Sequence, residues 1–156
     1  MKRKLLPRAI LVALLLVLPA AANAPPDQYA AFDSEALSIK DVFTGLEWDR
    51  RTVALVPYGV DANCSLVASL GGLGRLPTVK ELLTLLDEQP HPEYEFGMNV
   101  SKMFDQGAFD RQPVDKPYWT STPKEPGKVW TVSFANGLME PLATTGGATA
   151  YARCVR

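Results

Sequence analysis

The hydrophobic and polar positions of this chain alternate over short distances, which is the pattern of a sheet built from short strands. Short apolar runs bounded by turn residues predict four strands, and these are residues 36–39, 46–48, 52–56 and 149–155. A fifth is predicted where Trp130, Val132 and Phe134 alternate with Thr and Ser, and the Asn136-Gly137 that follows is a strong hairpin signal. The sheet is therefore expected to be antiparallel.

Two helices are predicted between these strands, and the first begins near Asp61. Asp61 is a favourable N-cap residue, and Cys64, Val67 and Leu70 follow at near-helical spacing. Gly71-Gly72 ends the run, because glycine readily takes the left-handed conformation that follows a helix.

The second helix is predicted by a capping box, in which the Thr78 hydroxyl and the Glu81 carboxylate each accept from a free backbone N–H of the first turn. The leucines at 82, 83, 85 and 86 form a broad apolar stripe, so one side of this helix is expected in the core. The prolines of 90–92 cannot continue a helix, which is expected to stop near Glu88. Short strands with two helices between them define the fold class as α+β.

Residues 89–116 form a long stretch with several prolines and aromatics and little periodicity. A loop of this length in a compact domain is often functional. Its acidic and aromatic part supplies three candidate ligand-contact residues, Glu93, Tyr94 and Phe96, and Lys124 is a fourth candidate further along the chain.

Residues 1–24 have the pattern of a signal peptide, with a cationic start, an apolar run over 9–18 and the small residues of Ala22-Asn23-Ala24. A run of about ten apolar residues is too short for the roughly 20 that a membrane-spanning helix needs, so cleavage after Ala24 is expected. Residues 25–35 are then a flexible lead-in and 36–156 a single domain. The protein is expected to be exported, either periplasmic or secreted, with no membrane span after cleavage.

Removal of this segment changes the charge of the protein. The segment holds four of the 16 basic residues and none of the 17 acidic ones, which leaves 12 basic and 17 acidic residues and a formal charge of −5. An acidic domain is not expected to bind nucleic acid, whose phosphates select basic surfaces. Long-range attraction to anionic polysaccharides is weakened too, although a local pair such as Lys124 and Lys128 could still act.

The few histidine and cysteine residues narrow the chemistry. His91 is the single histidine, so the chain has no HExxH or Cys₂His₂ zinc site, and a Ser-His-Asp site would have to use that residue. Two lone cysteines in an oxidising compartment usually pair. Two buried free thiols or a redox-active pair are the alternatives, and the missing Cys-x-x-Cys spacing speaks against the second.

Five segments, taken in order, resemble one known family. They are DVFTGLEW (41–48), GRLPTVKEL (74–82), YWTST (118–122), VWTVSF (129–134) and RCVR (153–156). Together they are similar to the bacterial domain-of-unknown-function family named for the C-terminal domain of the Legionella collagen-like adhesin. The resemblance runs from about Ile39 to the last residue. The chain departs from the family pattern at Val42, where the family usually has Asn, and at Leu73-Gly74, where it usually has an aromatic residue.

The resemblance implies a C-type-lectin-like architecture, with paired N- and C-terminal strands, two helices and a small antiparallel sheet that bears long loops. It also implies one disulfide, between Cys64 and Cys154. The motif residues are expected to be a structural signature, and they are Trp48, Arg75, Pro77, Glu81, Trp119 and Trp130. The three tryptophans are expected to anchor the core, and the arginine to serve a buried hydrogen-bond network at the start of the second helix.

The same resemblance favours an exported, non-catalytic binding module that recognises an extracellular polysaccharide or a matrix or envelope protein. A structural or interaction domain of the cell envelope is the alternative. A formylglycine-generating type of enzyme is a minor alternative, because that chemistry needs two close reactive cysteines. No cofactor is expected, and calcium is not supported, since the lectin motif Glu-Pro-Asn is reduced to Glu125-Pro126-Gly127 and loses an oxygen ligand.

Overall fold

The computed structural model of the chain describes residues 28–30, 36–51, 55–59, 64–95, 98–104, 108–109 and 113–156, with the backbone alone over 87–104. The predicted signal peptide and most of the predicted lead-in lie outside the described residues, as do Asp61 and Phe96. In chain order the elements are β1 (Ser38–Lys40), β2 (Glu47–Asp49), β3 (Val56–Pro57), η1 (Ala68–Leu70), α2 (Val79–Leu83), β4 (Leu86–Glu95), β5 (Met98–Phe104), β6 (Tyr118–Glu125), β7 (Lys128–Val132), β8 (Met139–Ala143) and β9 (Thr149–Ala150).

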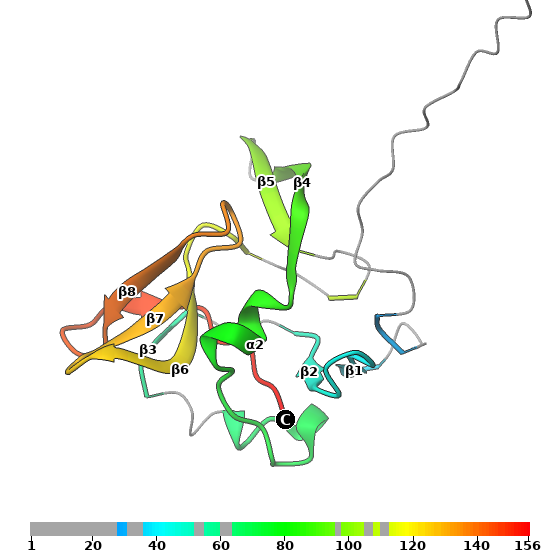
Figure 1. The fold of residues 1–156 in the computed structure, drawn as a ribbon, viewed down its shortest axis with the longest axis horizontal. Helices are drawn as coiled ribbons and strands as arrows, with labels where there is room; N and C mark the ends of the chain where they lie inside the picture. Colours follow the sequence, from blue (N-terminus) through cyan, green and yellow to red (C-terminus); the bar gives the residue numbers. More distant parts are fainter. Residues whose placement is uncertain are drawn as a thin grey trace, which may run out of the picture.

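Four small antiparallel sheets make up the β-structure of the described residues. Strands β6, β7 and β8 form a three-stranded meander, while β1–β2, β3–β9 and β4–β5 are two-stranded ribbons. Figure 1 shows the meander on the left, β1 and β2 on the right, and α2 between them, with the β4–β5 hairpin projecting from the body. The predicted α+β class with small antiparallel sheets is confirmed.

The predicted hairpin at Asn136-Gly137 joins β7 to β8. The backbone N–H of Ser133 donates to the Leu138 carbonyl at 2.9 Å, and Gly137 has a φ of 70°, a conformation that glycine adopts without strain. Val132 and Phe134 are buried as predicted.

Trp130, however, is only partly buried, so the prediction that it anchors the core is wrong. Val132 packs with Leu82 of α2 in the first cluster, whereas Val129 belongs to the second. Strand alternation puts Trp130 on the face of Val132, but the first cluster includes Val132 and does not extend to Trp130. The physical reason is therefore that the first cluster covers only the end of β7 at Val132.

The first predicted helix is not a continuous α-helix in the described residues. After Cys64 the chain makes i→i−3 hydrogen bonds, from Val67 to Cys64 and from Leu70 to Val67, and the short 3₁₀ helix η1 ends at Gly71 in the left-handed conformation. A Cβ atom on Gly74 would lie 2.3 Å from the Cys64 carbonyl oxygen. The segment therefore folds back on itself too tightly for a longer α-helix.

The second predicted helix forms with its capping box but is shorter than expected. The Glu81 N–H donates to the Thr78 hydroxyl oxygen, and the Glu81 carboxylate accepts from the Thr78 N–H. The helix ends at Leu83, and β4 begins at Leu86, within the predicted helix, and continues into the segment predicted as a loop. Prolines argue against a central strand, but β4 pairs with β5 alone, and an edge strand tolerates proline.

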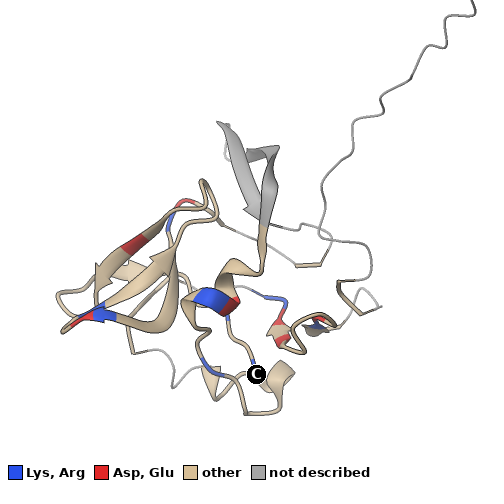
Figure 2. Ribbon diagram, in the orientation of Figure 1, with Lys and Arg blue, Asp and Glu red and all other residues tan. Residues whose placement is uncertain are grey.

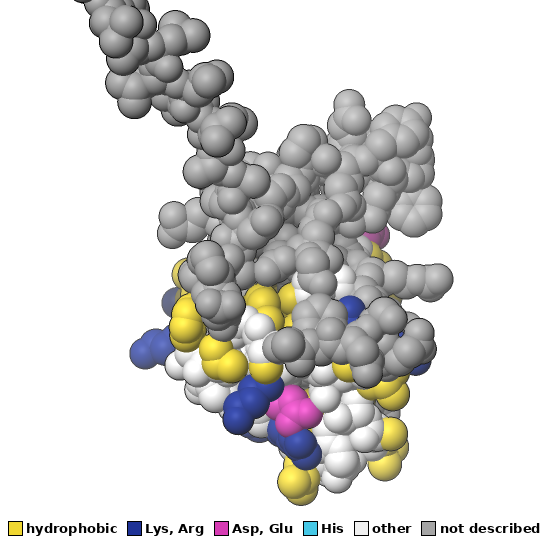
Figure 3. Space-filling model, turned by 90° about the vertical axis from the view of Figure 1, so that its right-hand side faces the viewer, with side chains coloured by type: hydrophobic (Ala, Val, Ile, Leu, Met, Phe, Trp, Pro, Cys, Tyr) yellow, Lys and Arg dark blue, Asp and Glu magenta, His cyan; other side chains and the backbone are white. Residues whose placement is uncertain are grey.

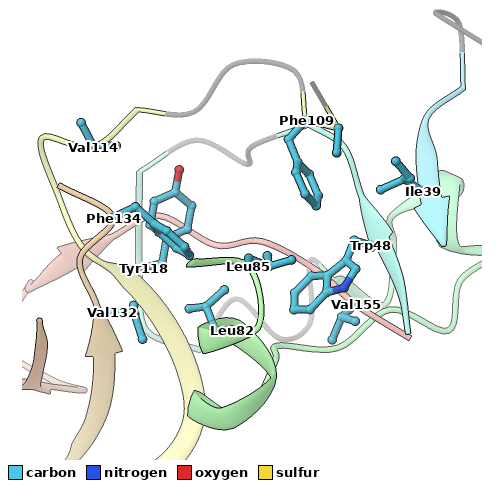
Figure 4. Close-up of a cluster of buried hydrophobic side chains, with 11 residues drawn as sticks. Ile39, Trp48, Leu82, Leu85, Phe109, Val114, Tyr118, Val132, Phe134 and Val155 are labelled. Atoms are coloured by element: carbon cyan, nitrogen blue, oxygen red, sulfur yellow. The ribbon is translucent and has the colours of Figure 1, made fainter. Parts of the chain in front are cut away.

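The interior holds two hydrophobic clusters. Figure 4 shows the first, in which Trp48 lies beside Val155, Tyr118 lies beside Phe134, and Leu85 lies between these two pairs. The second surrounds the disulfide between Cys64 and Cys154, and its other fully or nearly fully buried members are Leu70, Leu76, Trp119, Val129, Ala150 and Ala152. The predicted pairing of the two cysteines and the predicted shared face of Ala150, Ala152 and Cys154 are confirmed.

The last residues of the chain pass between the two clusters and join distant segments. Val155 packs into the first cluster, while its neighbour Cys154 belongs to the second. The backbones of Glu47 and Arg156 exchange two hydrogen bonds of 2.9 Å each, and Arg75 exchanges two with Val155. The last residues of the chain are thus joined to β2 and to the segment before α2, whereas the first strand, β1, pairs with β2 and the last strand, β9, pairs with β3.

Candidate functional site

The structure separates Lys124 from Glu93 and Tyr94, three of the four residues that sequence analysis proposed as ligand contacts. Glu93 and Tyr94 occupy register positions in the β4–β5 hairpin, opposite Val100 and Asn99, and Phe96 lies outside the described residues. Lys124 lies in β6, on the meander, and Figure 1 shows the meander's β6–β7 turn far from the β4–β5 hairpin. Lys124 therefore does not share a site with Glu93 and Tyr94.

Lys124 instead combines with Trp130 on the adjacent strand. The Lys124 ammonium nitrogen lies over the indole ring, 4.9 Å from its centroid, within the range of a cation–π interaction. Thr120 holds the strand that carries the indole, since its hydroxyl donates to the Trp130 carbonyl oxygen at 2.6 Å. Pro141, the register partner of Trp130 on β8, is exposed. These residues form a partly open aromatic surface, which we call the Trp130 platform.

The turn beside the platform is fixed by an ion pair. The Lys128 ammonium lies 2.8 Å from the Glu125 carboxylate, and that hydrogen bond lowers the pKa of Glu125. Gly127 supplies the positive φ of the two-residue turn, and its carbonyl oxygen accepts from the Thr144 N–H at 2.9 Å. Figure 2 shows the acidic and basic segments side by side at this turn. Glu125-Pro126-Gly127 is therefore a structured hairpin turn whose carboxylate is already paired.

The other two tryptophans are confirmed as core residues. Trp48 and Trp119 are fully buried, and the Trp119 indole N–H donates to the Val56 carbonyl oxygen at 2.8 Å. Of the three tryptophans of the chain, Trp130 alone is open to solvent. Contact of an aromatic side chain with water is unfavourable, so a ligand that covers the exposed ring gains hydrophobic free energy.

The Arg75 motif has a structural role at the start of α2. The Arg75 guanidinium makes a bidentate contact with the Glu81 carboxylate, at 2.7 and 2.8 Å, and this pairing lowers the pKa of Glu81 to about 2. The Pro77 carbonyl oxygen accepts from the Ser121 N–H, which ties the helix entrance to β6. The expectation that this network is buried is wrong, because the Arg75 side chain is 48% exposed.

Two arginines, Arg50 and Arg153, are buried, and the sequence analysis did not predict this. Arg153 is fully buried, donates to the Asp49 carbonyl oxygen at 2.9 Å and lies over the Phe109 ring. Arg50, also buried, donates from Nε to the Ala108 carbonyl oxygen. Burial lowers the pKa of Arg153 and raises that of Asp49. Since these arginines bind backbone carbonyls, they fix the segment around Phe109 to the core and are not ligand contacts.

The described residues form neither a cluster of metal-binding side chains nor a membrane-spanning helix. Where the structure describes the chain, no three His, Cys, Asp or Glu side chains gather in a way that could hold a metal ion. Within the described ranges there is also no helix with the length and hydrophobicity that a membrane crossing requires.

These features define a small α+β domain with one buried disulfide and an exposed aromatic surface on a three-stranded sheet. The model of the Lcl C-terminal domain family matches residues 38–156, most of the chain, and the chain belongs to this family. No curated protein and no solved structure matches it significantly. The family membership confirms the resemblance found in the sequence.

Proposed function

We propose that this chain is an exported, non-catalytic binding module of C-type-lectin-like architecture that recognises an extracellular polysaccharide through the Trp130 platform. The observation that carries the proposal is the Lys124 ammonium lying 4.9 Å from the centroid of a partly exposed indole. An aromatic face with one adjacent cation suits a sugar ring that carries a carboxylate or sulfate group. The indole stacks on the apolar side of the ring, and the lysine pairs with the anion.

The rigidity of the platform supports this use. The meander strand that carries Trp130 is hydrogen-bonded on both sides, to β6 and to β8, and its turn is held by the Glu125–Lys128 ion pair. A surface that is already ordered loses little conformational entropy when a ligand binds. The one large change required is that Lys124 moves from the ring face toward the anion, and an exposed lysine side chain makes this movement easily.

Export is supported by the disulfide and by the N-terminal pattern. A disulfide between two fully buried cysteines is typical of a protein from an oxidising compartment. The same bond bears on the enzyme alternative, because Cys64 and Cys154, the two thiols that it would need, are joined to one another. The domain would act as an adhesin-like or envelope-associated protein.

An array of glycans and matrix proteins tests the proposal. The wild-type protein, Trp130→Ala and the control Leu138→Ala are applied at low salt, with and without calcium; Leu138 is 54% exposed on the β7–β8 turn and outside the platform. We expect wild type and Leu138→Ala to bind the same acidic glycans and Trp130→Ala to bind at least tenfold more weakly, since truncation of a tryptophan at the centre of a binding site costs about 2 kcal/mol or more. Absence of any binding by wild type would refute the proposal.

A further inference from the structure

The tip of the β6–β7 hairpin, beside the Trp130 platform, carries three charged side chains. Lys124, Glu125 and Lys128 are all exposed there. From Pro123 to Glu125 the register advances by two residues on β6 but by one on β7, so Lys124 is an extra residue in β6. A bulge of this kind redirects a side chain, and here it lets two sequence neighbours, Lys124 and Glu125, lie on one face of the hairpin.

The ion pair between Glu125 and Lys128 lies on the same face as the indole. The two residues are register partners, and Trp130 follows Lys128 by two positions, a spacing that puts side chains on one face of a strand. The Lys128 ammonium lies 2.8 Å from the Glu125 carboxylate. The turn holds the two opposite each other, because the Gly127 carbonyl oxygen accepts from both the N–H and the hydroxyl of Thr144, at 2.9 and 3.1 Å.

This ion pair leaves the platform with a single uncompensated cation. Lys128 is matched by Glu125, whereas Lys124 has no carboxylate within ion-pair distance among the described residues, and its ammonium lies over the indole. On the other side of the indole, the β8 residues opposite β7 are Pro141 and Ala143, which carry no charge. A ligand on the platform therefore meets one cation, at the β6 edge of the ring.

The rest of the molecule does not extend this cation into a basic track. The exposed guanidinium groups of Arg75 and Arg156 are each paired with a glutamate, Glu81 and Glu47. Figure 3 shows the side of the molecule away from the β6–β7 turn, where basic side chains lie on both sides of an acidic one. The chain without residues 1–24 has a formal charge of −5, so it repels a polymer of closely spaced anions.

We propose that Glu125 is a specificity-determining residue, which neutralises Lys128 and so restricts the Trp130 platform to polysaccharides whose anionic groups are far apart. The inference rests on the proposed function and names its ligand class, a chain of mostly uncharged sugar residues with isolated carboxylate or sulfate groups. One such group pairs with Lys124, and the sugar ring beside it stacks on the indole.

Lys128 is a positioning residue in this arrangement. The pKa of Glu125 is lowered first by its hydrogen bond with Lys128 and also by the charge of Lys124, so both lysines attract the carboxylate. While Lys128 holds the carboxylate, Lys124 stays available over the indole. Without Lys128, the carboxylate pairs with Lys124 and competes with the anion of the ligand.

Three forms of one polymer test the inference, and they are dextran and two carboxymethyl-dextrans, of low and of high substitution. All share one glucose backbone and differ only in the number and spacing of the carboxylates. The exported protein is applied to each immobilised form over a range of salt concentrations, and its affinity is counted per carboxylate.

The test variant is Glu125→Gln, and the control is Glu140→Gln, which changes the net charge equally. Glu140 is exposed on β8, opposite Thr131, and strand alternation puts it on the face away from Trp130. Lys128→Gln and the double variant Glu125→Gln/Lys128→Gln test the positioning role. Thermal unfolding of each variant shows whether it is folded.

We expect the wild-type protein to bind the sparse carboxymethyl-dextran at least as tightly as the dense one, and dextran most weakly. Glu125→Gln should bind the dense form about threefold more tightly than wild type, because Lys128 is then free to contact the polymer. The slope of its log affinity against log salt should steepen by about one, the contribution of one further cation on a dense polyanion. Glu140→Gln should keep the wild-type slope.

Lys128→Gln should weaken binding to the sparse form about threefold, and the double variant should restore it, because the competing carboxylate is then gone. A direct contact between Lys128 and the ligand would leave the double variant as weak as the single one, which would overturn the positioning role.

The proposed specificity would be overturned by failure of the wild type to bind the sparse form, by an unchanged slope in Glu125→Gln, or by an equal change in Glu140→Gln. None of these results refutes the proposed function, which is measured separately as the loss of array binding in Trp130→Ala. Failure of the wild type on the array itself would refute both.

Discussion

Removal of the Cys64–Cys154 disulfide should lower the stability of this domain more than any single change on its surface. The perturbation is the double variant Cys64→Ala/Cys154→Ala. The bond closes a loop between residues separated by 90 positions, and both cysteines are fully buried. The bridge also joins the segment before η1 to the last residues of the chain, which pass between the two hydrophobic clusters.

The magnitude follows from the length of that loop. Closing a loop of this size lowers the entropy of the unfolded chain. In the chain-entropy treatment this raises the free energy of unfolding by about 4–5 kcal/mol. Unfolding entropies of about 2.1 cal/mol/K per residue give roughly 0.25 kcal/mol/K for a folded part of about 120 residues. The midpoint of thermal unfolding should then fall by about 15–20 °C.

Circular dichroism during heating measures this shift in the double variant and in reduced wild type, which should agree with one another. A shift smaller than about 5 °C would refute the claim that the disulfide stabilises the fold through its long loop. Thiol titration of the wild type, denatured without reductant, is the complementary test. Reaction of two equivalents of reagent would show that the bridge is absent.

Three further predictions concern single side chains. Arg75→Gln should lower stability by about 1 kcal/mol in urea unfolding at pH 7, since the Arg75 side chain is half exposed and its ion pair with Glu81 is screened by solvent. Because the pKa of Glu81 is lowered from 4.5 to about 2, the contribution of this pair is complete above pH 4.5 and is lost as the pH falls toward 2, so the variant should show a smaller decline in stability across that window. Asp41→Ala removes the acceptor of two backbone N–H groups and should cost about 2–3 kcal/mol by the same assay. Trp119→Ala should cost about 3–5 kcal/mol, whereas Trp130→Ala should cost about 1 kcal/mol; equal losses would contradict the different burial of the two indoles.

The local patterns of the sequence were sufficient where the physics is local. The Thr78–Glu81 capping box depends on four consecutive residues, and it forms as predicted. The turn at Asn136-Gly137 needs only a positive φ at the glycine, and it joins β7 to β8. The pairing of Cys64 with Cys154 came from the family resemblance and from there being no other cysteine to choose.

The failures concern residues whose environment depends on distant segments. Alternation puts Trp130 on the face of Val132, but the first cluster includes Val132 and does not extend to Trp130, and no short pattern reveals where a cluster ends. The prolines of β4 indicate a loop, but β4 pairs with β5 alone, and such an edge strand accepts proline. The buried arginines at 50 and 153 could not be predicted, since their acceptors are backbone carbonyls from remote segments.

The central claim is that the Trp130 platform binds the ligand, and the indole N–H signals in a nitrogen-15 NMR spectrum test it most directly. The three tryptophans give three signals, and the signal lost in Trp130→Phe identifies the platform. An acidic oligosaccharide selected on the array is then titrated into the wild-type protein. We predict that the Trp130 signal moves while those of the buried Trp48 and Trp119 stay in place. The claim would be contradicted if the ligand bound saturably while the Trp130 signal stayed in place, or if only the signal of a buried tryptophan moved.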